Sequence, residues 1–381
     1  MVRTFNILFI CSSLEPGKDG VGDYTRKLAC SLILRGHKAG IIALNERRMS
    51  GNTWTGDQVD NNIAVNVLRL PESLSWVKRL ALAKQFVNSF EPDWLSLQYV
   101  PFGFHLKGLP FRLGKILKQL HGNYHWHVMA HELAVNKEQS FKFKVWSSLQ
   151  VKIIRSIFMQ LQPLRIHTNT QLYKHRIKEM GFKAKVLPLF SNISKTAPEK
   201  KTIKHNIPAF ISQHRHRYII GTLFGSFDFK RWDMRSLLDK FTYRYSEKRV
   251  AIVSLGRMPA GQDCWVSLIK DYPQVEFISL GERSPDFISY WLSDYTDFGI
   301  LTTLPELSAK SGSFMAFKEH GVPVVCTKEN ASLQHLNIPV DKVLTVIDED
   351  KNFELPGRYA PASGLDDVVE QFINDLNSSQ P

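Results

Sequence analysis

Cysteine is scarce in this chain of 381 residues. The four cysteines, Cys11, Cys30, Cys264 and Cys326, are scattered, with no CxxC pair and no histidine at metal-ligand spacing. Paired cysteines are typical of disulfide frameworks and structural zinc sites, so the sequence favours neither. We expect reduced, buried thiols of the kind that cytoplasmic proteins carry, and no bound metal.

Long hydrophobic runs are absent as well. No apolar stretch approaches the roughly 20 residues needed to cross a bilayer. Residues 1–6 lead directly into a predicted strand, without the pattern of a signal peptide. We therefore expect a cytoplasmic protein, either soluble or peripheral on the inner membrane face. A hydrophobic fraction of 43% with 24 Phe excludes global disorder, and the length favours two domains.

Acidic residues are few in one segment of this basic chain, whose net charge is +13. Residues 103–185 hold 15 Lys or Arg against three acids. The spacing predicts a helix over 141–162 with a basic and an apolar face. The basic face holds Lys144, Lys152 and Arg155, and the apolar face Trp146, Leu149, Ile153 and Ile157. The region is either a solvated helix face or a surface for anionic lipid headgroups or an acidic lipid-linked substrate. No nucleic-acid recognition module is visible, so nucleic acid is not an expected partner.

A glycine-rich loop near the start is the most informative feature present. An apolar run at 7–11 predicts a buried strand, and a helical pattern follows Gly20 and Gly22. Glycines at such a turn let the backbone approach a phosphate or a sugar, with free N–H groups directed at it. The alternative is that the glycines only form a tight turn. The third glycine of a dinucleotide fingerprint is missing, and Asn45, not an acid, follows the next predicted strand at 40–44, which argues against an NAD site.

Strand and helix patterns alternate along the rest of the chain and predict two doubly wound domains. Further strands are predicted at 63–68, 94–98, 127–130, 185–189, 218–224, 250–255, 275–280, 298–302 and 322–326, and a helix at 76–90. Residues 99–104 read as a loop, and 191–217 as an interdomain linker with a poorly ordered approach to the next strand. We place the domains at 1–190 and 215–360, facing a central cleft between the carboxyl edges of their sheets.

Several motifs resemble those of the family-4-like glycosyltransferases of the GT-B superfamily. The segments 20–25 and 34–37 resemble the amino-terminal signature, as does 97–103. His131-Glu132 after a strand is similar to the family's histidine loop beside the donor sugar, and 319–325 resembles the element that follows the nucleotide site. The resemblance spans almost the whole chain. It implies two Rossmann-like domains, with the donor bound in the second and a carboxyl-terminal helix (365–381) packed back on the first.

The chain departs from this family where the nucleotide is bound. The two glutamates that the family carries eight positions apart correspond to Ser308 and Ala316, and the diphosphate-binding arginine corresponds to Ser226. In their place, Lys310, Ser311, Gly312 and Ser313 offer an ammonium, two hydroxyls and helix-start N–H groups for a diphosphate. Glu306 could replace a ribose or sugar contact.

The resemblance also implies roles for individual residues. The expected catalytic group is His131, Lys230 and Lys310; the lysines, with Arg231, would stabilise charge on the leaving diphosphate. His131 would bond the donor sugar, oriented by Glu132. The expected donor- or phosphate-binding residues are Gly20, Gly22, Gly225, Ser226, Arg231, Glu306, Ser311, Gly312 and Ser313. The expected acceptor-side residues are Asp23, Tyr24, Tyr99 and Phe102.

Three functions follow from these residues. The leading hypothesis is a glycosyltransferase that moves a sugar, with retention, from a nucleotide sugar to a glycan or lipid-linked acceptor in cell-envelope or exopolysaccharide synthesis. Such GT-B enzymes work without a bound metal, and the nucleotide sugar is a co-substrate. The second hypothesis is a catalytically degenerate GT-B scaffold that regulates an assembly complex. The third is a nucleotide-sugar epimerase.

Overall fold

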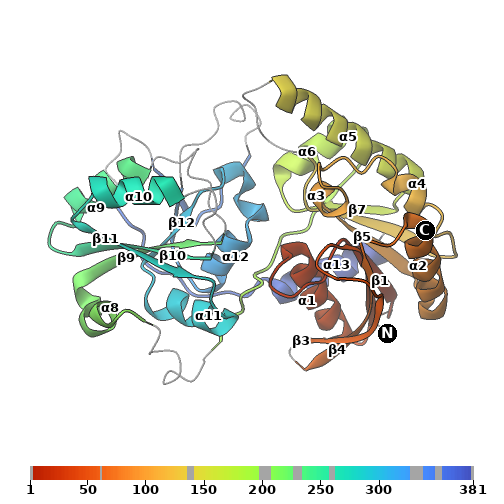
Figure 1. The fold of residues 1–381 in the computed structure, drawn as a ribbon, viewed down its shortest axis with the longest axis horizontal. Helices are drawn as coiled ribbons and strands as arrows, with labels where there is room; N and C mark the ends of the chain where they lie inside the picture. Colours follow the sequence, from red (N-terminus) through yellow and green to blue (C-terminus); the bar gives the residue numbers. More distant parts are fainter. Residues whose placement is uncertain are drawn as a thin grey trace. The chain divides into compact units, whose positions relative to one another are not determined.

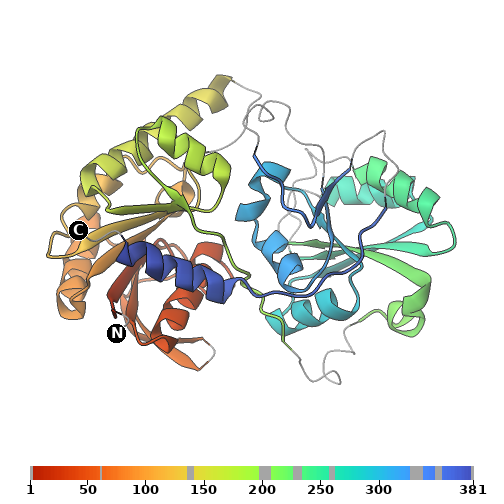
Figure 2. The ribbon, with the colours of Figure 1, turned by 180° about the vertical axis from the view of Figure 1, so that it is seen from behind.

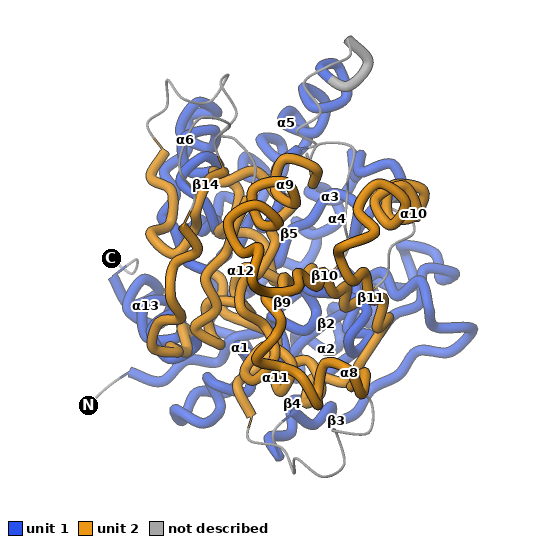
Figure 3. The backbone as a smooth tube through the Cα atoms, turned by 90° about the vertical axis from the view of Figure 1, so that its left-hand side faces the viewer, with its two compact units in different colours: residues 1–188, 365–381 blue, residues 189–364 orange. Residues whose placement is uncertain are grey.

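A computed structural model of the chain describes residues 3–60, 62–134, 141–196, 207–225, 234–256, 262–326, 338–347 and 354–378. The chain divides into two units, of which the first contains residues 1–188 and 365–381 and the second residues 189–364 (Figure 3). Each unit is built around one sheet. The carboxyl-terminal segment therefore belongs to the first unit, although the whole second unit precedes it in the sequence.

The first unit contains an eight-stranded sheet in the order β3-β4-β2-β1-β5-β6-β7-β8 (Figure 1). The strands are β1 (Asn6–Cys11), β2 (Lys38–Glu46), β3 (Trp54–Asp60), β4 (Ile63–Pro71), β5 (Trp94–Tyr99), β6 (His125–Ala130), β7 (Arg165–Thr168) and β8 (Lys185–Val186). All neighbours pair in parallel except β3, which is antiparallel to β4 at the edge. The central strands β1 and β5 are buried on both faces, which their largely apolar sequences favour.

The helices of the first unit follow its strands. They are α1 (Gly20–Leu34), α2 (Trp76–Phe90), α3 (Pro101–Phe104), α4 (Leu113–Leu117), α5 (Phe141–Leu161), α6 (Gln171–Glu179) and α13 (Leu365–Asn377). Figure 2 shows α13 beside the strands of the first unit. Hydrogen bonds from Gln371 Nε2 to the carbonyl of Val186 (2.7 Å) and from Arg165 to that of Asp375 (3.1 Å) attach it there. The helix at this end of the chain thus packs on the first unit.

The second unit contains a six-stranded, wholly parallel sheet in the order β11-β10-β9-β12-β13-β14. The strands are β9 (Tyr218–Phe224), β10 (Arg249–Leu255), β11 (Val275–Gly281), β12 (Phe298–Leu301), β13 (Val324–Cys326) and β14 (Leu344–Val346). The helices are α8 (Ala209–His214), η1 (Arg215–Arg217), α9 (Met234–Arg244), α10 (Gln262–Asp271), α11 (Pro285–Asp294), η3 (Pro305–Lys310) and α12 (Gly312–Glu319). Two hydrophobic clusters cover the two sheet faces, one with α11 and α12 and the other with α9 and α10. Alternate residues of β9 enter opposite clusters, because successive side chains of a strand point to opposite faces.

Most predicted elements are confirmed, and the corrections concern polar or short segments. The predicted loop at 99–104 instead contains the end of β5 and the short helix α3. Within the predicted linker, residues 209–217 form α8 and η1, because Ile207 and Ile211 are buried in the core of the second unit. The strands β3 and β7 and the helix α6 were not predicted; their sequences are polar, so hydrophobic periodicity does not reveal them.

Candidate functional site

At the carboxyl edge of the second sheet, three neighbouring strands end in glycine, which has no side chain. Gly225, Gly256 and Gly281 stand at the ends of β9, β10 and β11, with φ values of +99°, +114° and +66°. The N–H of Gly225 donates to Leu255 O and that of Gly256 to Gly281 O, both at 2.9 Å. A Cβ on Gly256 would lie 2.7 Å from the carbonyl oxygen of Gly225. Only glycine accommodates this packing, and the sequence prediction had included Gly225 but not the other two.

The helix α12 begins beside this edge. The Ser313 hydroxyl donates to the carbonyl of Phe224 at the end of β9, which joins the helix start to the sheet. Ser311 is the N-cap, and its hydroxyl accepts from the N–H of Phe314 at 3.3 Å. The first turn carries no acidic residue, Gly312 is exposed with open space where a Cβ would be, and half-buried Lys310 precedes it. The helix start therefore carries the positive end of the helix dipole, and no acidic side chain of its first turn neutralises it.

The positions of the absent paired glutamates lie in the interior. Ala316 is fully buried in α12, and Ser308 is buried in η3, where its carbonyl accepts from the N–H of Ser311 at 2.8 Å. Glu306, also in η3, is only 6% exposed. Glu319, at the end of α12, is buried and accepts from the N–H of Lys195. Ser226, Lys230 and Arg231 lie outside the described residues.

In the first unit, the helix start at the glycine loop is already occupied. Asp19 is the N-cap of α1, and its carboxylate accepts from the N–H groups of Val21 (3.0 Å) and Gly22 (2.9 Å). Burial raises the pKa of Asp19, against these two bonds that lower it. The expectation of free N–H groups for a phosphate is therefore wrong for this loop, because a carboxylate already fills the position of an anion. Gly20 faces open space, whereas the Cα of Gly22 packs against the backbone of Ser13.

A fully buried glutamate supports the same loop. β2 extends to Glu46, so an acidic residue does end this strand, contrary to the reading that stopped at Asn45. Its carboxylate accepts from the Ser13 hydroxyl, the Leu14 N–H and Arg69, each at 2.7 Å. These three bonds engage Glu46 inside the protein, so it is not available to the ribose of a dinucleotide.

Asp23 is similarly engaged. Its carboxylate accepts from the N–H of Gly17 at 3.2 Å and pairs with Arg26. Burial raises the pKa of Asp23, while the bonds from Gly17 and Arg26 lower it. The carboxylates of Asp19 and Asp23 are therefore both held by bonds within the first unit.

His131 follows β6 at the carboxyl edge of the first sheet and is 4% exposed. Its Nε2 lies 2.8 Å from Oε1 of Gln98, and its ring meets that of Tyr24 edge-on at 5.0 Å. Burial lowers the pKa of His131 to about 3, so the imidazole is neutral. Asn169, after β7, donates to the His131 carbonyl at 3.2 Å, while its buried Oδ1 has no partner among the described residues. The structure thus places His131 in contact with Tyr24, both of which the sequence had indicated. It adds Gln98 and Asn169, which the sequence analysis did not propose as site residues, although Gln98 lies within the motif at 97–103.

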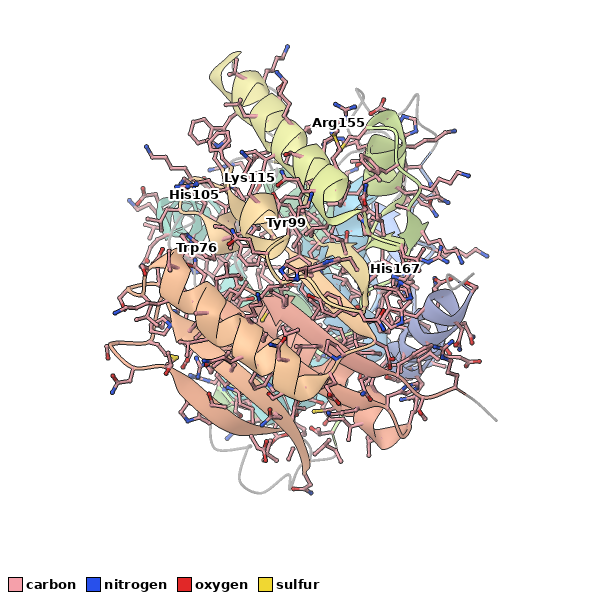
Figure 4. All side chains as sticks on the ribbon, turned by 90° about the vertical axis from the view of Figure 1, so that its right-hand side faces the viewer. Trp76, Tyr99, His105, Lys115, Arg155 and His167 are labelled. Carbon is pink, nitrogen blue, oxygen red and sulfur yellow. The ribbon has the colours of Figure 1, made fainter. Side chains whose placement is uncertain are left out.

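The three aromatic acceptor-side candidates differ in accessibility, and Tyr24 is buried, at 3% exposed. Tyr99 is fully buried and its ring stacks on Phe104, so it belongs to the interior of the first unit (Figure 4). Its expected contact with an acceptor is not available. Phe102, in α3, is 39% exposed and remains a candidate.

Comparison with known proteins relates the chain to others by fold alone. No family model and no curated protein sequence matches it. An Escherichia coli trehalose-phosphate synthase structure bound with UDP-2-fluoro glucose has a TM-score of 0.54 at 9% identity, over 97% of this chain and 91% of that one. Anabaena Alr3699/HepE in complex with UDP and glucose has a TM-score of 0.53 at 14% identity, over 99% and 92%. A possible UDP-N-acetylglucosamine 2-epimerase from Listeria monocytogenes has a TM-score of 0.51 at 9% identity, over 97% and 87%.

These similarities cover both units, and the chain therefore has the two parallel-sheet domains of the GT-B fold. Within the part of the chain that the structure describes, no helix combines the length and apolarity that a membrane span requires. No group of three or more His, Cys, Asp or Glu side chains among those residues is arranged to hold a metal ion.

Proposed function

We propose that this protein is a family-4-like glycosyltransferase that transfers a sugar from a nucleotide sugar to a glycan or lipid-linked acceptor. One observation carries the proposal: of the two helix starts that the sequence motifs marked, α1 is capped by the carboxylate of Asp19, whereas α12 is capped by neutral Ser311 and preceded by Lys310. A diphosphate is therefore favoured at α12, next to Gly225 and Gly256. GT-B neighbours with UDP or ADP bound support a nucleotide-sugar substrate.

The chemistry assigns distinct tasks to the two units. When the bond between the sugar and the diphosphate breaks, negative charge grows on the leaving group, and the Lys310 ammonium with the first N–H groups of α12 would stabilise it. Lys230 and Arg231, which follow β9 in the sequence, would assist. Neutral His131 would exchange hydrogen bonds with the donor sugar, and Glu132 would orient its loop. We propose retention of configuration and no metal requirement, as the family resemblance implies.

The acceptor would be bound by the first unit. The carboxylates of Asp19 and Asp23 hold the loop before α1, and exposed Phe102 offers an aromatic face for a sugar ring. The segment between β5 and β6 exposes apolar Leu106 and Phe111 among basic side chains. This mixture supports peripheral binding to anionic membrane, where lipid-linked acceptors for envelope polysaccharides reside.

Calorimetric titration of the purified protein with UDP, ADP, GDP and dTDP tests the proposal. We expect one nucleotide to bind, and Lys310→Ala to weaken that binding about tenfold, the loss of one charge-assisted contact. Lys270→Ala, at the end of α10, is the matched control and leaves the affinity unchanged. A folded protein that binds none of the four nucleotides would instead indicate a scaffold that has lost donor binding. Turnover of UDP-N-acetylglucosamine without any acceptor would indicate an epimerase.

A further inference from the structure

An unbroken line of hydrogen-bonded side chains connects α13 to His131 through the interior of the first unit. Its members, in order, are Asp375 in α13, His167 in β7, His127 in β6, Ser96 and Gln98 in β5, and His131 after β6. The distances are 3.0 Å from Asp375 to His167, 3.0 Å from His167 to His127, and 2.7 Å from His127 to Ser96. They are 2.8 Å from Ser96 to Gln98 and 2.8 Å from Gln98 to His131. All six residues are buried, and His167 lies beside α13 in Figure 4.

The direction of every bond in this line follows from its first member. A carboxylate only accepts hydrogen bonds, so Nε2 of His167 carries the proton that points to Asp375. Nδ1 of neutral His167 is then an acceptor, and Nε2–H of His127 donates to it. By the same step, Nδ1 of His127 accepts from the Ser96 hydroxyl.

The second half of the line transmits this direction to His131. Because the Ser96 proton is committed to His127, the Ser96 oxygen accepts from the amide Nε2 of Gln98. The Gln98 amide is thereby oriented with its Oε1 toward His131. Oε1 only accepts, so His131 carries its proton on Nε2 and keeps the lone pair on Nδ1.

The electrostatic conditions for this arrangement are present. Burial lowers the pKa of His127 and of His167, which keeps both imidazoles neutral. The pKa of Asp375 is lowered despite burial, which would raise it, because His167 and Lys185 bond its carboxylate. Lys185 pairs with the Asp375 carboxylate and Arg165 donates to the Asp375 backbone carbonyl, and both lie at the α13 end of the line.

We propose that Asp375 is a positioning residue, which fixes the Nε2–H tautomer of His131 through His167, His127, Ser96 and Gln98. A hydroxyl of a bound ligand then meets a hydrogen-bond acceptor at Nδ1 of His131. The helix α13 follows the second unit in the sequence. Through Asp375 it thus determines which ring nitrogen of His131 carries the proton. The tautomer itself does not depend on the proposed function, and only its use in sugar binding rests on it.

The tautomer can be read directly by long-range ¹H–¹⁵N correlation spectra of protein labelled with ¹⁵N-histidine. His131→Gln assigns the signals. In the wild-type protein we expect His131 as the Nε2–H form between pH 6 and 8. Asp375→Asn offers His167 either a carbonyl oxygen or an amide N–H, so both directions of the line become possible and His131 becomes a mixture of tautomers. Asp366→Asn is the matched control on the same helix, because Asp366 pairs with Arg35 at the surface, and it leaves the spectrum unchanged.

A second variant keeps the test decisive if Asp375→Asn does not fold. Ser96→Ala removes the oxygen that orients Gln98, and we expect the same mixture of tautomers. Folding is verified in each case by the dispersion of the amide spectrum. If His131 stays wholly in the Nε2–H form in the folded variants, the line only attaches α13 and the proposal is overturned. Since no nucleotide is added, this result is independent of whether the protein transfers sugars.

Discussion

The backbone of Ser13 packs directly against the Cα of Gly22, so that a Cβ there would fall within 3.0 Å of the Ser13 carbonyl oxygen. Gly20, two residues earlier, faces open space. The two glycines of one motif therefore have different reasons to be glycine. Gly22 is required by close packing of α1 on the loop after β1, whereas a Cβ on Gly20 would have no atom of the described residues within 4 Å outside its own helix backbone and chain neighbours.

This difference predicts opposite stability effects. Gly22→Ala would overpack a backbone contact that cannot yield, and we expect it to lower the free energy of unfolding by about 3 kcal/mol. Gly20→Ala introduces a better helix former at the start of α1, and we expect stability to be unchanged or slightly higher. Urea unfolding of the two variants, followed by circular dichroism, measures both. Equal destabilisation by the two substitutions would contradict the packing argument.

The charge at the start of α12 can be inverted without loss of its cap. Aspartate is as good an N-cap as serine, so Ser311→Asp should leave the melting temperature unchanged or raised. The new carboxylate repels a diphosphate at the same helix start, and we expect nucleotide affinity to fall at least about tenfold, the size of one adverse charged contact. Ser75→Asp makes the same change at the N-cap of α2 and serves as control for net charge. An undiminished affinity in folded Ser311→Asp would place the diphosphate elsewhere.

Glu46, at the end of β2, and Glu72, directly after β4, form two ion pairs that can be compared. Glu46 is fully buried and bonds Arg69, Ser13 and Leu14, whereas Glu72 is exposed and pairs with Arg47 at 3.4 Å. Glu46→Gln leaves Arg69 partly uncompensated, and we expect a loss of about 3 kcal/mol of unfolding free energy. We expect Glu72→Gln to change it by less than about 1 kcal/mol. Similar losses in denaturant unfolding would show that Glu46 does not organise the loop.

The neutral state of His131 predicts how stability depends on pH. Its pKa is lowered to about 3 in the folded protein, against about 6.5 in an unfolded chain. Between these values the unfolded state binds the proton and the native state does not, so stability falls as the pH drops below about 6.5. The contribution of His131 approaches about 1.4 kcal/mol per pH unit. His131→Gln should reduce the slope of unfolding free energy between pH 7 and 5 by this amount. A slope equal to that of the wild-type protein would contradict the prediction.

The segment between β5 and β6 predicts membrane binding that needs both apolar and basic side chains. Leu106 and Phe111 are 72% and 59% exposed, and Lys107, Arg112 and Lys115 are exposed beside them; Figure 4 shows Lys115 on this side of the first unit. We expect sedimentation with phosphatidylglycerol vesicles, weakened by salt and by the double substitution Leu106→Ser with Phe111→Ser. Val77→Ser with Leu34→Ser, at other exposed apolar positions, is the control. Equal binding to neutral and anionic vesicles, unaffected by salt, would remove the prediction.

Much of the fold could be predicted because buried parallel strands carry their own signal. The run at 7–11 is continuously apolar and those at 94–98 and 218–224 are largely so, and the helix at 76–90 was predicted at its exact bounds. β7 escaped prediction because the sequence Arg-Ile-His-Thr buries its polar side chains by pairing them with partners far along the chain. Hydrophobic periodicity predicts which apolar residues are buried, but it does not reveal polar residues that are buried with hydrogen-bond partners.

The candidate site shows the same division. The sequence determined two parallel-sheet domains, the glycine at the end of β9 and the helix start at 311–313, because each depends on residues adjacent in the chain. Only the tertiary structure decided that Asp19 occupies the α1 start, that Glu46 is internal and that Tyr99 is inaccessible. Only the tertiary structure also showed that a line of hydrogen bonds connects Asp375 to His131. Hydrogen bonds between residues so distant in sequence depend on how strands and helices are ordered in space.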